Sequence, residues 1–92
     1  MKLTVDGVAY EVKEPSRAVK REIALAWSGV FNLRTNYFDA EGTKRLIELV
    51  EKHLIGDEEH PVYQLAPRAQ VDALREIGRL VAEGLTGEER PD

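Results

Sequence analysis

The feature that most constrains the fold is an Asp6-Gly7 pair between two runs in which apolar and polar residues alternate. Asp-Gly favours a two-residue type I′ turn, because both central residues of that turn need a positive φ. Such a turn pairs Val5 with Val8, and in this register the apolar side chains of residues 2–13 share one side. They form a hairpin face of Leu3, Val5, Val8, Tyr10 and Val12. An isolated hairpin is marginal in water, so we expect this face to cover other elements.

Three later segments carry apolar side chains at the three- and four-residue spacing of amphipathic helices. They span about residues 16–28, 40–55 and 67–84. Ser16 and Asp39 have the side chains preferred at helix N-caps, and Pro67 suits the first turn of the third helix. The clearest apolar stripe belongs to the third helix and comprises Val71, Leu74, Ile77, Gly78 and Val81. Gly78 within that stripe predicts a close approach to another helix.

These segments predict an α+β fold that is mostly α, with a two-stranded N-terminal hairpin packed on three helices. The length of 92 residues fits a single domain, which we place at residues 1–87, with 88–92 as a flexible polar tail. Residues 29–38 show no clear period, and a ten-residue connection is long for so small a domain.

Composition and charge narrow the classes of function. The chain has no Cys, which favours a reducing compartment such as the cytoplasm, and no stretch approaches the roughly 18 apolar residues of a membrane span. The net charge is −4, and residues 1–36 hold six basic against four acidic groups. Residues 37–92 hold seven basic against thirteen acidic groups. An acidic chain is poorly suited to general nucleic-acid binding, whose affinity comes mainly from neutralising phosphates.

The sequence offers little catalytic chemistry. His53 and His60 stand near several carboxylates, but not at the spacings typical of metal ligands. No Gly-rich phosphate loop or nucleophile elbow is present. We therefore predict no catalytic, metal or cofactor-binding site, and a non-enzymatic protein.

The connection after the first helix carries the best candidates for a protein-binding or self-association face. They are Phe31, Leu33, Tyr37 and Phe38. Aromatic side chains commonly anchor interfaces. Arg17, Lys20 and Arg21, on the helix before them, are expected to form a charged rim. The alternative is that the aromatic side chains of this region, Trp27 included, fold inward and complete the core.

The layout of the chain resembles a known family. Residues 1–12 read Met-Lys-Leu-Thr-Val-Asp-Gly-Val-Ala-Tyr-Glu-Val, and a basic amphipathic helix follows that contains Arg17-Ala-Val-Lys-Arg-Glu-Ile. With the later Leu46-Ile-Glu-Leu-Val-Glu and Val71-Asp-Ala-Leu-Arg-Glu-Ile segments, this layout resembles small tail-assembly chaperones of long-tailed bacteriophages. The resemblance implies that the protein acts in the host cytoplasm. There it would coat an apolar helical tape-measure protein and help recruit tail-tube subunits.

Two other functions stay open at this point. One is a small structural or adaptor subunit that is retained in a virion or another protein assembly. The other is a nucleic-acid-binding regulator that uses Arg17, Lys20, Arg21 and Arg34. A gene next to a very long coiled-coil reading frame would favour the chaperone over both.

Overall fold

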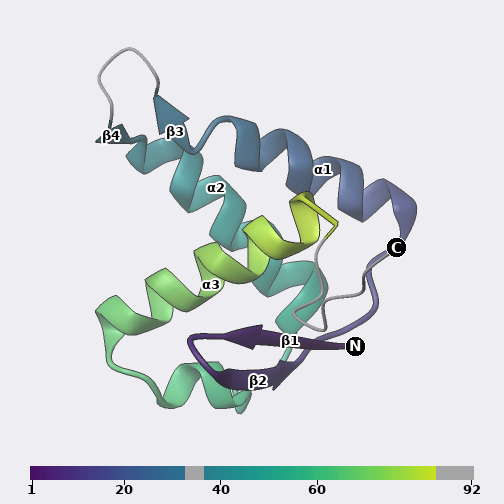
Figure 1. Ribbon diagram of the computed structural model, residues 1–92, viewed down its shortest axis with the longest axis vertical. Coiled ribbons are helices and arrows are strands. Elements are labelled where there is room, and N and C mark those ends of the chain that lie inside the picture. Colours follow the sequence, from purple (N-terminus) through teal and green to yellow (C-terminus); the bar gives the residue numbers. More distant parts are fainter. Residues whose placement is uncertain (33–36, 85–92) are drawn as a thin grey trace.

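The computed structural model describes residues 1–32 and 37–84, with only the backbone described at 31, 32, 37 and 38 (Figure 1). In chain order the elements are β1 (Lys2–Val5), β2 (Val8–Glu11), α1 (Arg17–Ser28), β3 (Phe31–Asn32), β4 (Tyr37–Phe38), α2 (Ala40–Val50), the π-helical segment η1 (Glu51–Ile55), the 3₁₀-helix η2 (Pro61–Gln64) and α3 (Pro67–Ala82). The fold is α+β and mostly α, as expected. The β1–β2 hairpin lies at the opposite end of the molecule from the short β3–β4 pair (Figure 1).

The hairpin has the predicted register. Val5 pairs with Val8 and Leu3 with Tyr10, while the turn residues Asp6 and Gly7 have φ values of 52° and 81°. Four of the five apolar side chains of the hairpin face are buried. The exception is Val8, which is 50% exposed. It lies at the turn, where it lines an open hollow of about 180 Å³ between the hairpin tip and the first turns of α3.

One cross-strand contact differs from expectation. The register places Lys2 opposite Glu11, which predicts an ion pair between them. The Glu11 carboxylate instead lies 3.0 Å from the α-amino group of Met1. That amino group also donates to the carbonyl of Val12 at 2.7 Å, so the start of the chain is already held beside Glu11.

His60 is buried, with 8% exposure, although the sequence places it in an acidic surface loop. Its Nδ1 accepts the backbone N–H of Val62 at 3.1 Å, so Nε2 carries the proton and donates to the carbonyl of Glu11 at 2.7 Å. The ring also stacks on Tyr10. Glu11 directly precedes Val12, which exchanges both hydrogen bonds with Met1, so the Glu11 carbonyl points away from β1. The imidazole thus closes the outer edge of β2.

The helix ends follow the predicted capping residues. The Ser16 hydroxyl accepts from the N–H of Val19 at 3.2 Å, and a carboxylate oxygen of Asp39 accepts from Gly42 at 2.6 Å. The second helix continues past Val50 as the π-helical segment and ends at Gly56, whose φ of 65° suits a glycine C-cap. The third helix starts at Pro67 as expected.

Glycines allow close contacts between the helices. A Cβ on Gly78 would lie 2.9 Å from a side-chain carbon of Leu46 on α2, which confirms the predicted close approach of the third helix to another helix. A Cβ on Gly42 would collide with the carbonyl oxygen of Gly29, at the end of α1. Four of the five residues in the predicted α3 stripe are buried. The prediction is wrong only for Val71, which is 40% exposed.

Candidate protein-interaction surface

The segment expected to carry the interface forms a second, very short hairpin. Phe31 pairs with Phe38, and Asn32 with Tyr37. The N–H of Asp39 bonds to the carbonyl of Val30, which joins this hairpin to the end of α1 and the start of α2. Leu33 lies outside the described residues, as do the side chains of Phe31, Tyr37 and Phe38. Whether these side chains bind a partner therefore stays a prediction.

The expected charged rim lies elsewhere. Arg17, Lys20 and Arg21 are all exposed on the first turns of α1, and none has an ion pair with another described residue. The β3 strand follows the other end of this 12-residue helix, which is about 18 Å long. The structure brings the three basic residues together with one another, but it does not bring them to the β3–β4 hairpin.

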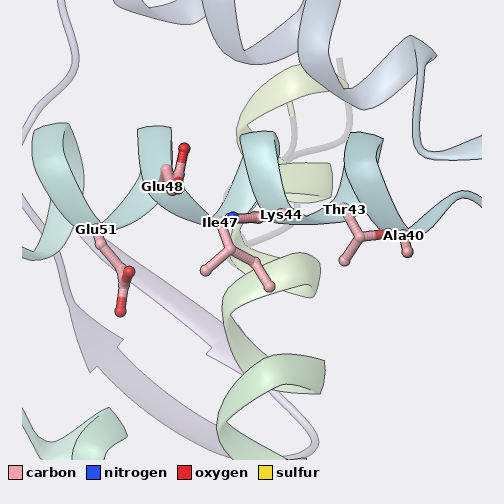
Figure 2. Close-up of a pocket in the computed structure, with 6 residues that line it drawn as sticks. All are labelled: Ala40, Thr43, Lys44, Ile47, Glu48 and Glu51. Carbon is pink, nitrogen blue, oxygen red and sulfur yellow. The ribbon is translucent and has the colours of Figure 1, made fainter.

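Sequence reasoning missed an open groove along the outer side of α2. We define this α2 groove by its lining residues, which are Ala40, Thr43, Lys44, Ile47, Glu48 and Glu51. Its volume is about 510 Å³, and Figure 2 shows Thr43, Ile47 and Glu51 projecting from the same side of the helix. A neighbouring hollow of about 420 Å³ shares Glu48 and Glu51 with it and continues to Tyr63, and another of about 410 Å³ lies beside it on α2 and shares Lys44 and Glu48.

The groove exists because α2 carries more apolar side chains than the core covers. Leu46 and Val50 point inward and are fully buried, whereas Ile47 lies only partly buried on the adjoining side of the helix. Ala40, Thr43 and Ile47 recur at helical spacing on that outer side. A helical projection of α2 could have separated these residues from the core stripe, so a signal for the groove was present in the sequence.

The groove changes character along its length. The end nearest the start of α2 is lined by Ala40, Thr43 and Ile47. The Thr43 hydroxyl oxygen is buried, and no described residue gives it a hydrogen bond. The hollow that adjoins the other end of the groove holds the carboxylates of Glu48, Glu51, Asp57 and Glu58, against the two cations Lys52 and Lys13, the latter beside Gly56.

Tyr63 fixes one of these carboxylates in place. Its hydroxyl donates to Glu51 at 2.7 Å. Burial, then the hydrogen bond to Glu51 and the negative charges of Glu51 and Glu58, raise the pKa of Tyr63 to about 12. The far end of the groove is therefore an ordered, negatively charged surface.

Neither histidine belongs to a metal-ligand cluster. His53 Nε2 lies 3.9 Å from a carboxylate oxygen of Glu22, and both ring nitrogens of His60 make hydrogen bonds to the backbone. In residues 1–32 and 37–84, no three histidine or carboxylate side chains gather closely enough to hold a metal ion.

No helix in the described part of the chain is long and apolar enough to cross a membrane. No protein-family model, curated protein or solved structure matches the chain.

Proposed function

We propose that this protein is a non-enzymatic, cytoplasmic protein-binding module that acts as a tail-assembly chaperone of a long-tailed bacteriophage. In this role it binds apolar helical segments of a tape-measure protein and helps recruit tail-tube subunits. The observation that carries the proposal is the α2 groove, an open surface with an apolar stripe beside charged side chains. Amphipathic helices bind to surfaces of this kind through apolar residues spaced at three and four positions.

The shape of the groove favours a helix over a small molecule. A typical ligand pocket encloses most of its ligand, whereas all six residues that line the α2 groove come from one helix. The 11 residues of α2 extend for about 16 Å, which matches about three turns of a partner helix. The neighbouring hollow that reaches Tyr63 adds further length for such a helix.

Co-expression with apolar helical fragments of a tape-measure protein tests this proposal. We expect the chain to keep these fragments soluble and to co-purify with them. Ile47→Lys places a charge in the groove, and its long side chain can extend to water, so we expect it to abolish co-purification while the fold persists. The matched control is Val71→Lys, which adds the same charge at an exposed valine outside the groove and should retain binding.

Two results would contradict the proposal. One is that the unaltered chain neither solubilises nor binds the fragments. The other is that Ile47→Lys and Val71→Lys weaken binding equally. A chain that binds the fragments and is then found in finished tails would instead be a retained structural subunit.

A further inference from the structure

The outer side of α1 carries a surface that no other described element covers. Leu25 is 68% exposed, the highest value of any large apolar side chain in the described residues. Arg17 and Arg21 precede it at four-residue spacing, so the three side chains lie along the same side of the helix. We call these three residues the α1 ridge. The ridge is basic at the start of α1 and apolar toward its end, and Lys20 adds a further positive charge beside Arg21.

The α2 groove has a complementary pattern. Thr43, Ile47 and Glu51 also stand four residues apart, but here the uncharged residues come first and the acidic residue last. The carboxylates of Asp57 and Glu58 continue the acidic end beyond Glu51.

We propose that the α1 ridge of one copy of the chain docks antiparallel into the α2 groove of a second copy. A four-residue step is about 6 Å along either helix, so the two patterns stay in step. Leu25 then contacts Thr43 and Ile47 of the second copy, and Arg21 faces its Glu51. This is the packing of one four-residue ridge beside another that helix pairs commonly use.

Charge selects the antiparallel orientation. With Leu25 at the apolar end, Arg17 approaches Asp57 and Glu58 of the second copy, where four carboxylates face the two cations Lys52 and Lys13. The groove residue Lys44 lies beside Thr43 and Ile47, at the end away from both arginines. A parallel arrangement would place Arg17 beside Lys44 and would set Leu25 among the carboxylates, which costs desolvation without forming ion pairs.

The ridge and the groove are different surfaces of the same chain, so the contact is heterologous. Each copy in a pair keeps one free ridge or one free groove, and further copies can add to either end. A second copy and a tape-measure helix would exclude each other from the α2 groove, but self-association is measured without any tape-measure protein, so its test is separate from that of the proposed chaperone function.

Sedimentation velocity on two variants and on their mixture tests the contact. Leu25→Glu replaces the apolar residue of the ridge by a charged one, and Ile47→Lys places a charge in the groove. For the unaltered chain, we expect the average mass of the sedimenting species to rise with protein concentration. High salt screens the ion pairs and should abolish this rise. Each variant alone should self-associate roughly tenfold or more weakly, the loss expected at a central interface residue. An equimolar mixture should form a dimer and no larger species, because it retains one intact ridge and one intact groove.

Several results would overturn this proposal. They are an unaltered chain that stays monomeric at every concentration, single variants that associate like the parent, or a mixture that stays monomeric although both variants are folded. Should Ile47→Lys unfold, as judged by circular dichroism, Ala40→Lys replaces it, because Ala40 is an exposed residue of the same groove. Val71→Lys is the control for added charge, and it should associate like the parent.

Discussion

The β1–β2 hairpin and the outer side of α2 are both amphipathic, but only the hairpin is covered by the rest of the chain. Helices bury Leu3, Val5, Tyr10 and Val12 of the hairpin face, and His60 closes the adjacent strand edge. On α2, by contrast, Ala40 is exposed, and Thr43 and Ile47 are only partly buried. The covered apolar residues stabilise the fold, and we propose that the open ones bind other chains. Changes in the two regions should therefore affect different measurements.

The largest effect on stability is expected from Val5→Asp. Val5 is buried, and the new carboxylate would have no positive partner, while Asp6 and Asp72 line the adjacent hollow. An unpaired buried charge costs roughly 3–5 kcal/mol of unfolding free energy. Chemical denaturation measures this loss. Val8→Asp is the matched control, since Val8 lies on the same face but is half exposed, and its effect should be far smaller. Equal effects of the two variants would mean that the hairpin face is not covered as described.

A smaller loss is expected from His60→Phe. Phenylalanine preserves an aromatic ring beside Tyr10, but it leaves the Val62 N–H and the Glu11 carbonyl without their side-chain partner. Leaving a buried polar group unsatisfied costs about 1–3 kcal/mol. His53→Phe, which removes only a distant contact with Glu22, should change the midpoint of thermal unfolding much less. A His60→Phe variant as stable as the parent would show that these hydrogen bonds contribute nothing.

The carboxylates near Tyr63, at the acidic end of the α2 groove, should raise the pH at which this tyrosine ionises. The folded chain holds the proton of Tyr63 more tightly than the unfolded chain, because its pKa rises from 10.0 to about 12. The resulting stability is fully present below about pH 10 and is lost as the pH rises through about 12. Ultraviolet absorbance should therefore show a late-ionising component that Tyr63→Phe removes. A titration that Tyr63→Phe leaves unaltered would contradict the contact with Glu51.

The smallest effects on stability are expected at the open surfaces. Ala40→Lys in the α2 groove and Leu25→Glu on the α1 ridge replace exposed side chains. Each should change the free energy of unfolding by no more than about 0.5 kcal/mol, as is usual for surface substitutions. Urea denaturation of the two variants measures this. A loss of several kcal/mol in either would assign the residue to the core.

Local rules predicted most of the fold. The Asp6-Gly7 turn set the hairpin register, Ser16 and Asp39 set two helix starts, and Gly78 indicated a close helix contact. Each of these features depends on residues near one another in the sequence, or on the absence of a side chain at a single glycine. The exposed positions of Val8 and Val71 depend instead on where the covering elements end. A periodic pattern alone does not contain that information.

The candidate surface was less predictable for the same reason. The contact of His60 with Glu11 spans 49 residues, and no local pattern indicates it. The basic residues of α1 were expected to form a rim beside the β3–β4 segment, but the length of the helix separates them from that hairpin. The helical spacing alone places Ile47 in a single apolar stripe with Leu46 and Val50, whereas the structure divides α2 into a buried side and an open side.

Site-specific photo-cross-linking tests most directly whether the open side of α2 is a docking surface. A photo-cross-linking amino acid would replace Ala40 in the groove or, as the control, Val8 at the hairpin tip, and each chain would be co-expressed with tape-measure fragments. Both positions are exposed, so the two probes are comparably accessible. We predict that position 40 gives covalent products with the fragments or with a second copy of the chain, and that position 8 gives none. Products from position 8 alone, or equal yields from the two positions, would contradict the assignment of the α2 groove as the binding site.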